Sequence, residues 1–393
     1  MNSAWPPQFV FAVCQRGAEH ALKQQVSARL GNVHPAFSRP GFVTFKLDEP
    51  CSEPENFQMP SPFARTFGFC LGKVTGSDVN ELASQAWALP AVEQLLTTYP
   101  LDDLHVWQRD AAAPGEHSFE PGPTPLALEA ESALREHSPL EKLQTEASEL
   151  SGPSRRNRWV MDVVLVEPGE WWIGCHRTTR RCDCWPGGVP LLELPEYAVS
   201  RAYLKMLEAL EWSALPMSQG DVCIELGCAP GGASQALLDS GLKVIGVDPA
   251  EVAPVVLEHP QFTHIRRRCT EVPRKQLKGV KWLAADMSVM PTYTLDAVEG
   301  MVTHSEAGIR GIVLTLKLTD WKLVEDLPAC LERIRSWGYR DIRARQLAFN
   351  RQEICIVALR SRGQRRVVRR SRRRRFDKAH SNKPAGPHSA QKP

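Results

Sequence analysis

The chain lacks any long hydrophobic run, which excludes several classes of protein. Of its 393 residues, 42% are hydrophobic and 24% are charged, the ordinary balance of a globular chain. No apolar stretch approaches the roughly 18 residues of a membrane-spanning helix. The segment Phe9–Cys14 is too short, and has no basic flank, to be a signal peptide. We therefore expect a cytoplasmic protein without a membrane segment.

A disulfide framework is missing as well. The eleven cysteines are an odd number and are spread over the whole length, whereas disulfide-stapled secreted domains are small and have closely spaced cysteines. We expect reduced thiols in an intracellular protein.

Acidic residues are scarce at one end of the chain. From Arg360 onward there are ten Arg and three Lys against one acid, Asp377, a net charge of +12, so the preceding residues carry −9 of the total of +3. A basic tail on an acidic body is typical of a protein whose tail meets a polyanion. A solubilising or non-specific tail is the alternative. We expect residues 361–393 to be disordered.

The front half of the chain mixes strands and helices without a catalytic motif. Alternating apolar residues predict strands, and helical periodicity predicts helices. The expected strands are residues 9–13, 41–45, 67–74, 104–107, 159–166 and 171–176, and the expected helices are residues 18–30, 79–96 and 126–135. The last two strands form a β-hairpin candidate. Residues 110–125 and 136–157 are interpreted as polar loops.

From residue 200 onward, helices and strands alternate regularly. The expected helices are residues 200–212, 231–240, 293–305 and 321–337, and the expected strands are residues 222–226, 243–247, 262–265, 282–285, 311–316, 341–347 and 354–359. This order predicts an α/β, Rossmann-like fold with a doubly wound, parallel-type sheet, whose ligands bind at the carboxyl ends of the strands.

The most specific local pattern is Glu225–Gly232, E-L-G-C-A-P-G-G, between a strand and a helix. Glycines 227, 231 and 232 let the backbone approach a ligand closely. The spacing is not the G-x-G-x-x-G of a dinucleotide site, and the G-K-[ST] of a phosphate loop is absent. Asp248 closes the next strand, where a carboxylate accepts hydrogen bonds from ribose hydroxyls. These features favour a nucleoside cofactor without phosphate, S-adenosylmethionine.

This loop resembles motif I of the FtsJ-like ribose 2′-O-methyltransferases, D-L-G-x-x-P-G-G. Glu225 replaces the usual Asp, and Ala233 stands where that family often has an aromatic residue. The family also has a Lys-Asp-Lys-Glu tetrad, whose members match Lys205, Asp286, Lys317 and Glu353 in order. Lys205 lies on the helix before the loop, and the other three lie at strand ends.

The resemblance implies a site and a substrate. The implied cofactor-binding residues are Ser200, Gly227, Ala229, Pro230, Gly231, Gly232, Asp248 and Asp286. The motifs S-R-x-x-L-K and L-K-L, together with an α+β front half, resemble those of a bacterial subgroup of this family that has an N-terminal THUMP-like region. That subgroup methylates a cytidine ribose of large-subunit (23S) ribosomal RNA, so ribosomal RNA is the implied partner.

The tetrad predicts how the reaction is assisted. Methyl transfer from a sulfonium is an in-line displacement that depends on placing the attacking oxygen, and this oxygen must lose its proton. We expect the neighbouring ammonium of Lys205 and partial burial to lower the pKa of Lys317. Lys317 is the predicted base or orienter of the 2′-hydroxyl, supported by Asp286, Lys205 and Glu353. The sequence does not decide which group accepts the proton.

One position departs from the family pattern. After the third strand the family usually has an acid that contacts the adenine amino group, but here the run Arg266–Cys269 is R-R-R-C, and the first carboxylate is Glu271. The adenine contact then falls to a backbone carbonyl, or the cofactor binds weakly.

Two cysteine patterns suggest other chemistry. Cys175, His176, Cys182 and Cys184 do not have the spacing of a zinc site, so no metal is expected. Cys228 is similar to a residue of the RNA cytosine-C5 methyltransferases, but their Pro-Cys motif is replaced here by Asp286-Met-Ser-Val, so Cys228 is interpreted as a packing residue. The motif (N/D)-P-P-Y of guanine-N2 enzymes is absent too.

Aromatic and basic residues gather around residue 176. This set is interpreted as an RNA-facing surface or, equally, as an ordinary solvated face: Trp171, Trp172, Arg177, Arg180, Arg181 and Trp185.

Together these observations predict four parts: a small ferredoxin-like α+β module (1–70), a THUMP-like RNA-binding domain with polar insertions (71–190), an FtsJ-like methyltransferase domain (191–360) and a basic tail (361–393). The expected function is S-adenosylmethionine-dependent 2′-O-methylation of an RNA ribose. The alternatives are a non-catalytic RNA-binding or ribosome-assembly protein, which the missing adenine-contact acid favours, and an RNA base methyltransferase. The sequence does not determine the oligomeric state; a monomer is favoured.

Overall fold

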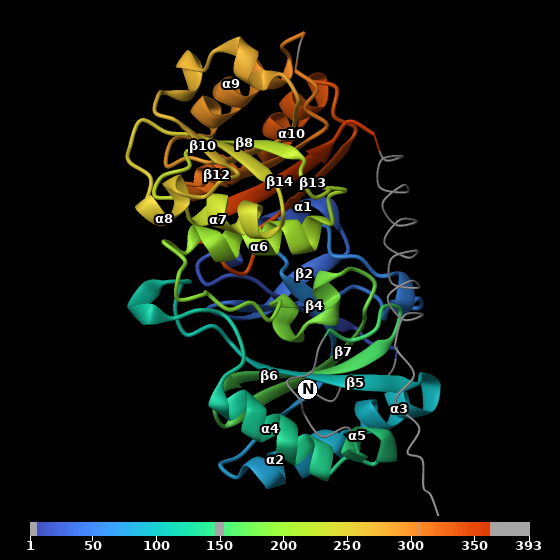
Figure 1. Ribbon diagram of the computed structural model, residues 1–393. Helices are drawn as coiled ribbons and strands as arrows, with labels where there is room; N and C mark the ends of the chain where they lie inside the picture. The colour runs from blue at the N-terminus through green and yellow to red at the C-terminus, as the bar shows by residue number, and fades with distance from the viewer. Residues whose placement is uncertain (1–5, 146–152, 306, 362–393) are drawn as a thin grey trace, which may run out of the picture.

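The computed structural model describes residues 6–145, 153–305 and 307–361, which form two seven-stranded sheets, one in each half of the chain (Figure 1). Beyond Ser361, the predicted basic tail lies outside the described residues. In the part that the structure describes, no helix has the length and apolar character needed to cross a membrane.

The front sheet has the order β2-β3-β1-β4-β7-β6-β5. Its strands are β1 (Phe9–Val13), β2 (Val33–Arg39), β3 (Phe42–Leu47), β4 (Thr66–Thr75), β5 (Leu101–Gln108), β6 (Trp159–Glu167) and β7 (Glu170–Arg177). β5 runs parallel to β6, and all other neighbours are antiparallel. The predicted β6–β7 hairpin is confirmed. The module boundary expected near residue 70 falls inside β4, which pairs with both β1 and β7.

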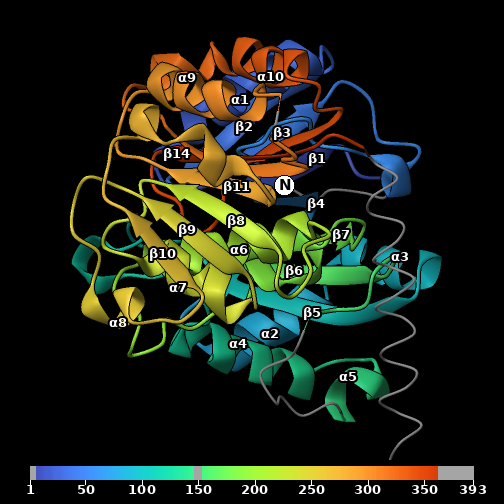
Figure 2. The same cartoon turned by 45° about the horizontal axis from the view of Figure 1, so that its top comes forward.

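The front half also carries α1 (Glu19–Arg29), α2 (Val79–Trp87), α3 (Pro90–Thr98), α4 (Pro125–Glu136) and α5 (Glu141–Thr145). The helix expected over residues 79–96 is two helices, because Pro90 lacks an N–H group and starts a new first turn. Helices α2, α4 and α5 lie together on one face of the front sheet (Figure 1). Helix α1 lies instead on the side of the rear half (Figure 2), where Gln24 Nε2 donates to Glu325 Oε1 at 3.4 Å.

The rear sheet has the order β10-β9-β8-β11-β12-β14-β13. Its strands are β8 (Val222–Leu226), β9 (Lys243–Val247), β10 (Phe262–Ile265), β11 (Val280–Asp286), β12 (Gly311–Lys317), β13 (Asp341–Arg345) and β14 (Glu353–Leu359). The chain moves outward from β8 to β10 and returns to β11, so the switch point lies between β8 and β11. The Rossmann-like prediction is confirmed. One strand differs from a parallel sheet, since β14 runs antiparallel to both neighbours.

Helices cover both faces of the rear sheet, because its strands are apolar on both sides. They are α6 (Ala202–Ser213), α7 (Gly232–Asp239), α8 (Pro254–Leu257), α9 (Pro291–Val302) and α10 (Leu327–Ser336). Side chains of α6 and α7 pack on one face, and those of α9 and α10 pack on the other. The short α8 was not predicted, and the helix expected from residue 321 begins at Leu327.

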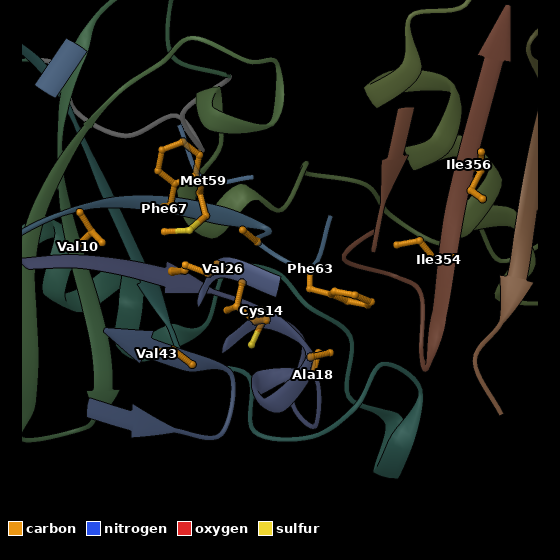
Figure 3. Packing of buried hydrophobic residues seen from close by; sticks show 14 of the residues in the cluster. Val10, Cys14, Ala18, Val26, Val43, Met59, Phe63, Phe67, Ile354 and Ile356 are labelled. Atoms are coloured by element: carbon orange, nitrogen blue, oxygen red, sulfur yellow. The ribbon is translucent and has the colours of Figure 1, made fainter. Parts of the chain in front are cut away.

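One hydrophobic core runs through both halves. Figure 3 shows Phe63 between residues of the front sheet, such as Val43, and Ile354 of β14. The fully buried Phe63 ring also meets the edge of the Trp321 ring, with centroids 6.0 Å apart. This shared packing holds the front half against the rear sheet and fixes its position relative to the site described next.

Candidate active site

The site begins with the loop Glu225–Gly232, which joins β8 to α7. Gly227 has φ +78° and Gly231 has φ +123°, in the left-handed region that side chains disfavour. A Cβ at Gly227 would also lie 2.9 Å from the carbonyl oxygen of Asp286. Glycine therefore lets this loop lie directly against the end of β11.

A cavity of about 300 Å³ lies over this loop, at the lower end of the range for small-molecule sites. Six of the predicted cofactor-binding residues line it: Ser200, Gly227, Ala229, Pro230, Gly232 and Asp286. The Ser200 hydroxyl oxygen is buried and has no hydrogen-bond partner among the described residues. A buried polar atom of this kind needs a ligand or water, so the residues present fit a polar cofactor.

The other two predicted cofactor residues, Gly231 and Asp248, do not line this cavity. The Asp248 carboxylate accepts hydrogen bonds from the backbone N–H groups of Ala229 (3.1 Å) and Ala250 (2.8 Å). It therefore fixes the loop from the neighbouring strand β9. Each carboxylate oxygen has a second lone pair, so a ribose hydroxyl is still a possible donor to Asp248.

The predicted tetrad forms a closed ring of ion pairs. The Nζ atom of Lys205 lies 2.5 Å from Asp286 Oδ2 and 3.2 Å from Glu353 Oε2. The Nζ atom of Lys317 lies 2.9 Å from Asp286 Oδ1 and 2.6 Å from Glu353 Oε1. Each ammonium thus bridges both carboxylates, and all four residues line the 300 Å³ cavity.

The reversed strand β14 explains how these residues meet. Asp286 and Lys317 lie at the ends of the parallel neighbours β11 and β12. Because β14 is antiparallel to β12, its first residue, Glu353, lies directly opposite Lys317. Lys205 reaches the same point from α6, which packs on one face of the rear sheet.

The expected direction of one pKa shift is wrong. Burial alone lowers the pKa of Lys317, but the carboxylates of Asp286 and Glu353 outweigh it, and the pKa is raised above its ordinary value. Burial raises the pKa of Asp286, yet the ammonium groups of Lys205 and Lys317 hold it below its ordinary value. Asp286 is therefore ionised, and Lys317 keeps its proton at neutral pH.

Glu225, the residue that replaces the family's Asp, is a neutral acid in this site. It is 1% exposed and lines the cavity. Burial raises its pKa to about 8, although a hydrogen bond from the Ser234 hydroxyl opposes the rise, and the carboxylates of Asp286 and Asp248 add to it.

Sequence reasoning missed three residues that connect the ring to the front half. Asn350 Nδ2 donates to Glu353 Oε2 at 3.1 Å, and its backbone oxygen accepts from Gln15 Nε2 at 2.6 Å. Arg201 and Arg351 line the cavity. The sequence did offer a signal for both arginines, because Arg201 directly follows Ser200 and Arg351 lies two residues before Glu353.

The polar loop 110–125 of the front half rests on these arginines. Arg351 Nε donates to the Pro114 carbonyl at 2.8 Å, and Arg201 forms a bidentate pair with Glu120. Gly115, with φ +75°, packs against the Arg201 guanidinium, where a Cβ would lie 2.7 Å from its Nε atom. This loop therefore contacts two residues that line the cavity, Arg201 and Arg351.

The surface predicted around residue 176 is wrong for Trp171 and Trp172, whereas Arg181 is exposed and Arg177, Arg180 and Trp185 are partly exposed. Trp171 is 0% exposed and Trp172 is 8% exposed, because β7 is an inner strand covered on both faces. Arg180 is bound to Asp183 at 2.6 Å and lies over the Phe67 ring. These residues pack within the front half.

The cysteine alternatives lead to no site. The side chain of Cys175 packs in the main core, on the opposite face of β7 from His176. Burial raises the pKa of the Cys228 thiol, and this residue packs in the core beneath α7. The interpretation of Cys228 as a packing residue is confirmed.

As the sequence indicated, the five residues that follow strand β10 include no acid. Arg266 donates to the Pro249 carbonyl at 3.3 Å and pairs with Glu251 at 3.1 Å on the surface. No carboxylate lies within residues 266–270. An adenine contact through a backbone carbonyl stays a prediction.

Comparison with known proteins gives a family match for the rear half of the chain. The family profile described as FtsJ-like methyltransferase matches residues 198–392. A "Ribosomal RNA large subunit methyltransferase M" of Halorhodospira halophila is 32% identical over 183 residues, which are 45% of this chain and 51% of that protein. A protein of the same name from Teredinibacter turnerae is 31% identical over 211 residues, 50% and 58% of the two chains.

The chain thus spans about half the length of the curated relatives it matches. Among solved structures, TrmN from Thermus thermophilus aligns with 90% of this chain and 99% of its own, at 15% identity and a TM-score of 0.35. This superposition is too loose to assign the front half to a fold. The predicted resemblance to the FtsJ-like family is confirmed by the profile match.

Proposed function

We propose that this chain, whose residues 198–392 match the FtsJ-like methyltransferases, transfers a methyl group from S-adenosylmethionine to a ribose 2′-hydroxyl of RNA. The closed ring of Lys205, Asp286, Lys317 and Glu353 supports this most directly. The ring lies beside the glycine loop at the switch point of the sheet, where α/β folds bind their ligands.

Ser200, Ala229, Pro230 and Gly232 would hold the cofactor against the loop, and Asp248 would accept from its ribose. When bound, the cofactor supplies a methyl group on a positively charged sulfur, with a neutral leaving group. Asp286, which lines the same cavity, would lie between this cofactor and the attacking oxygen.

Lys317 would orient that oxygen. An ammonium group has three donors, and Lys317 directs two of them to Asp286 and Glu353. The third is left for the ribose hydroxyl, whose remaining lone pair then points along the line of attack. Because the pKa of Lys317 is raised, we favour orientation over proton abstraction by this residue.

We infer that the RNA is large-subunit ribosomal RNA and that the nucleoside is a cytidine. The names of the relatives support the first inference, and the S-R-x-x-L-K and L-K-L motifs support the second. The front half would bind structured RNA through a ferredoxin-like module (1–70) and a THUMP-like domain (71–190). The basic tail would add contacts with RNA phosphates. A cytoplasmic location follows from this substrate.

A non-catalytic RNA-binding protein is the second candidate, because no acid follows β10 to contact adenine. Isothermal titration with S-adenosylmethionine separates the two. We expect binding by the wild-type protein and weaker binding by Ser200→Val, which removes the unpartnered hydroxyl. The exposed Ser218 lies away from the cavity, and Ser218→Val serves as the control. No binding at millimolar cofactor would support the non-catalytic candidate.

A further inference from the structure

A second group of potential ligands lies inside the front sheet, outside the methyl-transfer site. It consists of His105 on β5, Asp162 on β6 and His176 on β7, which are 1%, 0% and 4% exposed. One donor atom from each residue lies within 4.8 Å of the other two.

The register of three neighbouring strands brings these residues together. His105 lies opposite Asp162 across the β5–β6 pair. Asp162 lies opposite Gly174 on β7, two residues before His176 on the same face. Phe11 and Trp107 pack on this face as part of an apolar cluster. The cluster is therefore held by rigid strands in an apolar surrounding, where an uncompensated polar atom is costly.

The hydrogen bonds around His105 assign its tautomer. The Ser154 hydroxyl donates to Asp103 Oδ2 at 2.6 Å, and that carboxylate is paired with Arg135. Since the single Ser154 hydrogen is used there, its oxygen accepts from His105 Nε2 at 2.8 Å. The Nδ1 atom of His105 then carries a lone pair, and it has no hydrogen-bond partner among the described residues.

His176 is oriented in the same way. Its Nε2 atom lies 2.8 Å from the Asp183 carbonyl oxygen, which only accepts, so this nitrogen carries a hydrogen. Its Nδ1 atom lies 2.7 Å from Asp162 Oδ2. The other carboxylate oxygen, Asp162 Oδ1, is buried without a hydrogen-bond partner in the described part of the chain.

Two buried acceptors of the cluster, His105 Nδ1 and Asp162 Oδ1, therefore have no donor among the described residues. A hydrogen on His176 Nδ1 would satisfy only the contact with Asp162 Oδ2. A divalent cation would satisfy all three ligands at once.

We propose that His105, Asp162 and His176 bind one divalent transition-metal ion, of which zinc is the best match, as a structural centre that ties β5, β6 and β7 together. Two imidazoles and one carboxylate are ligands that suit Zn²⁺. Metal-bound histidines usually donate their other ring N–H to a carbonyl, a carboxylate or a water. Here His176 donates to the Asp183 carbonyl, and His105 reaches a carboxylate through Ser154.

A route for the ion also exists. His105 and Ser154 border a cavity of about 720 Å³ along the edge of β5. A water from this cavity would complete the coordination. This set shares only His176 with the cysteine-rich pattern considered from the sequence.

The test uses the full chain without a purification tag, treated with a chelator and then titrated with ZnCl₂. We expect one equivalent of zinc by mass spectrometry of the metal and a higher Tm, with no comparable effect of MgCl₂. Asp162→Asn keeps the side-chain volume and should lower zinc affinity at least about 100-fold, and Ser154→Ala about 10–100-fold. The exposed His20→Gln is the matched control.

The absorption spectrum of the cobalt(II)-substituted protein distinguishes this site from adventitious binding by the free cysteines. The proposal predicts visible bands without the intense thiolate-to-cobalt absorption, and their loss in Asp162→Asn and His105→Gln. If the chelated wild-type protein gains less than about 0.2 equivalent of zinc with an unchanged Tm, the proposal is wrong. Equal zinc binding by wild type and Asp162→Asn would also overturn it.

Discussion

Lys317 has the most direct part in the proposed reaction, since its ammonium is fixed by two carboxylates and keeps one donor free. Lys317→Ala should lower the rate of methyl transfer at least about 100-fold, the lower scale for losing a group that handles the reacting proton or its oxygen. Cofactor affinity should change little. Single-turnover kinetics with ribosomal RNA measure the first effect, and titration calorimetry measures the second.

The exposed Lys322→Ala is the control for this variant, because it removes the same charge five residues away on the surface. Near-normal turnover by Lys317→Ala would contradict the proposed role of Lys317 in orienting the ribose hydroxyl. A matching loss of cofactor affinity would instead place Lys317 in the cofactor site.

Glu225 should make stability depend on pH. Its pKa is about 8 in the folded protein against an ordinary value of 4.5, so the folded protein holds a proton that the unfolded chain releases. The contribution of Glu225 to the free energy of unfolding is therefore fully present below pH 4.5, and it is lost as the pH rises through about 8. Glu225→Gln mimics the neutral acid and should match wild type near pH 5.

At pH 8.5 the Glu225→Gln variant should be more stable than wild type, by on the order of a few kcal/mol. Urea unfolding at the two pH values measures this difference, with the exposed Glu258→Gln as the control. An equal pH dependence in wild type and Glu225→Gln would show that the acid is ionised in the folded protein.

Among the loops, residues 110–125 contact the cavity-lining Arg201 and Arg351 through Glu120 and Pro114. Glu120→Gln should weaken the contact with Arg201, a partly exposed pair worth at most about 1 kcal/mol. We expect kcat/KM for RNA to fall about three- to fivefold while cofactor affinity stays constant. The exposed Glu129→Gln on α4 is the matched control, and an equal effect of the two variants would mean that the loop does not position the site.

The order of elements explains what the sequence could predict about the site. Asp286 and Lys317 end parallel strands, and the carboxyl ends of such strands meet at one edge, so their proximity followed from the pattern. The position of Glu353 depends on β14 running backwards, which apolar runs do not reveal. The strand β2 (Val33–Arg39) was missed because most of its side chains are not buried, and its pattern lacks apolar alternation.

The direction of the Lys317 pKa shift could be determined only from the structure. From the sequence, a second lysine nearby suggested a lowered pKa. In the folded protein both carboxylates lie within 2.9 Å of Lys317, and they outweigh burial. Likewise, Trp171 and Trp172 lie a few residues before Arg177, Arg180 and Arg181 in the sequence, but their burial follows from the inner position of β7.

The two halves of the molecule are joined by a buried hydrogen-bond network that ends at the ring of Lys205, Asp286, Lys317 and Glu353. Gln346 Nε2 donates to Gln15 Oε1 at 2.6 Å, Gln15 donates to the Asn350 carbonyl, and Asn350 donates to Glu353. The front half therefore supports the position of a ring carboxylate as well as the shared core.

Gln15→Ala should destabilise the protein by about 1–3 kcal/mol, because it leaves buried polar groups without partners. It should also lower the transfer rate about three- to tenfold through Glu353. Chemical unfolding and single-turnover kinetics measure the two effects. Gln24→Ala, which removes a long, exposed contact across the halves (3.4 Å to Glu325), should do neither. If Gln15→Ala changes stability but not rate, the network is structural only.

The central claim is that the methyl group goes to a ribose oxygen. The most direct test is to incubate unmodified ribosomal RNA with the protein and methyl-labelled S-adenosylmethionine, digest the RNA completely and identify the labelled nucleoside by mass spectrometry. We predict label in a 2′-O-methylnucleoside, specifically 2′-O-methylcytidine, in the large-subunit RNA. Label on a base, or no label despite cofactor binding, would contradict the account.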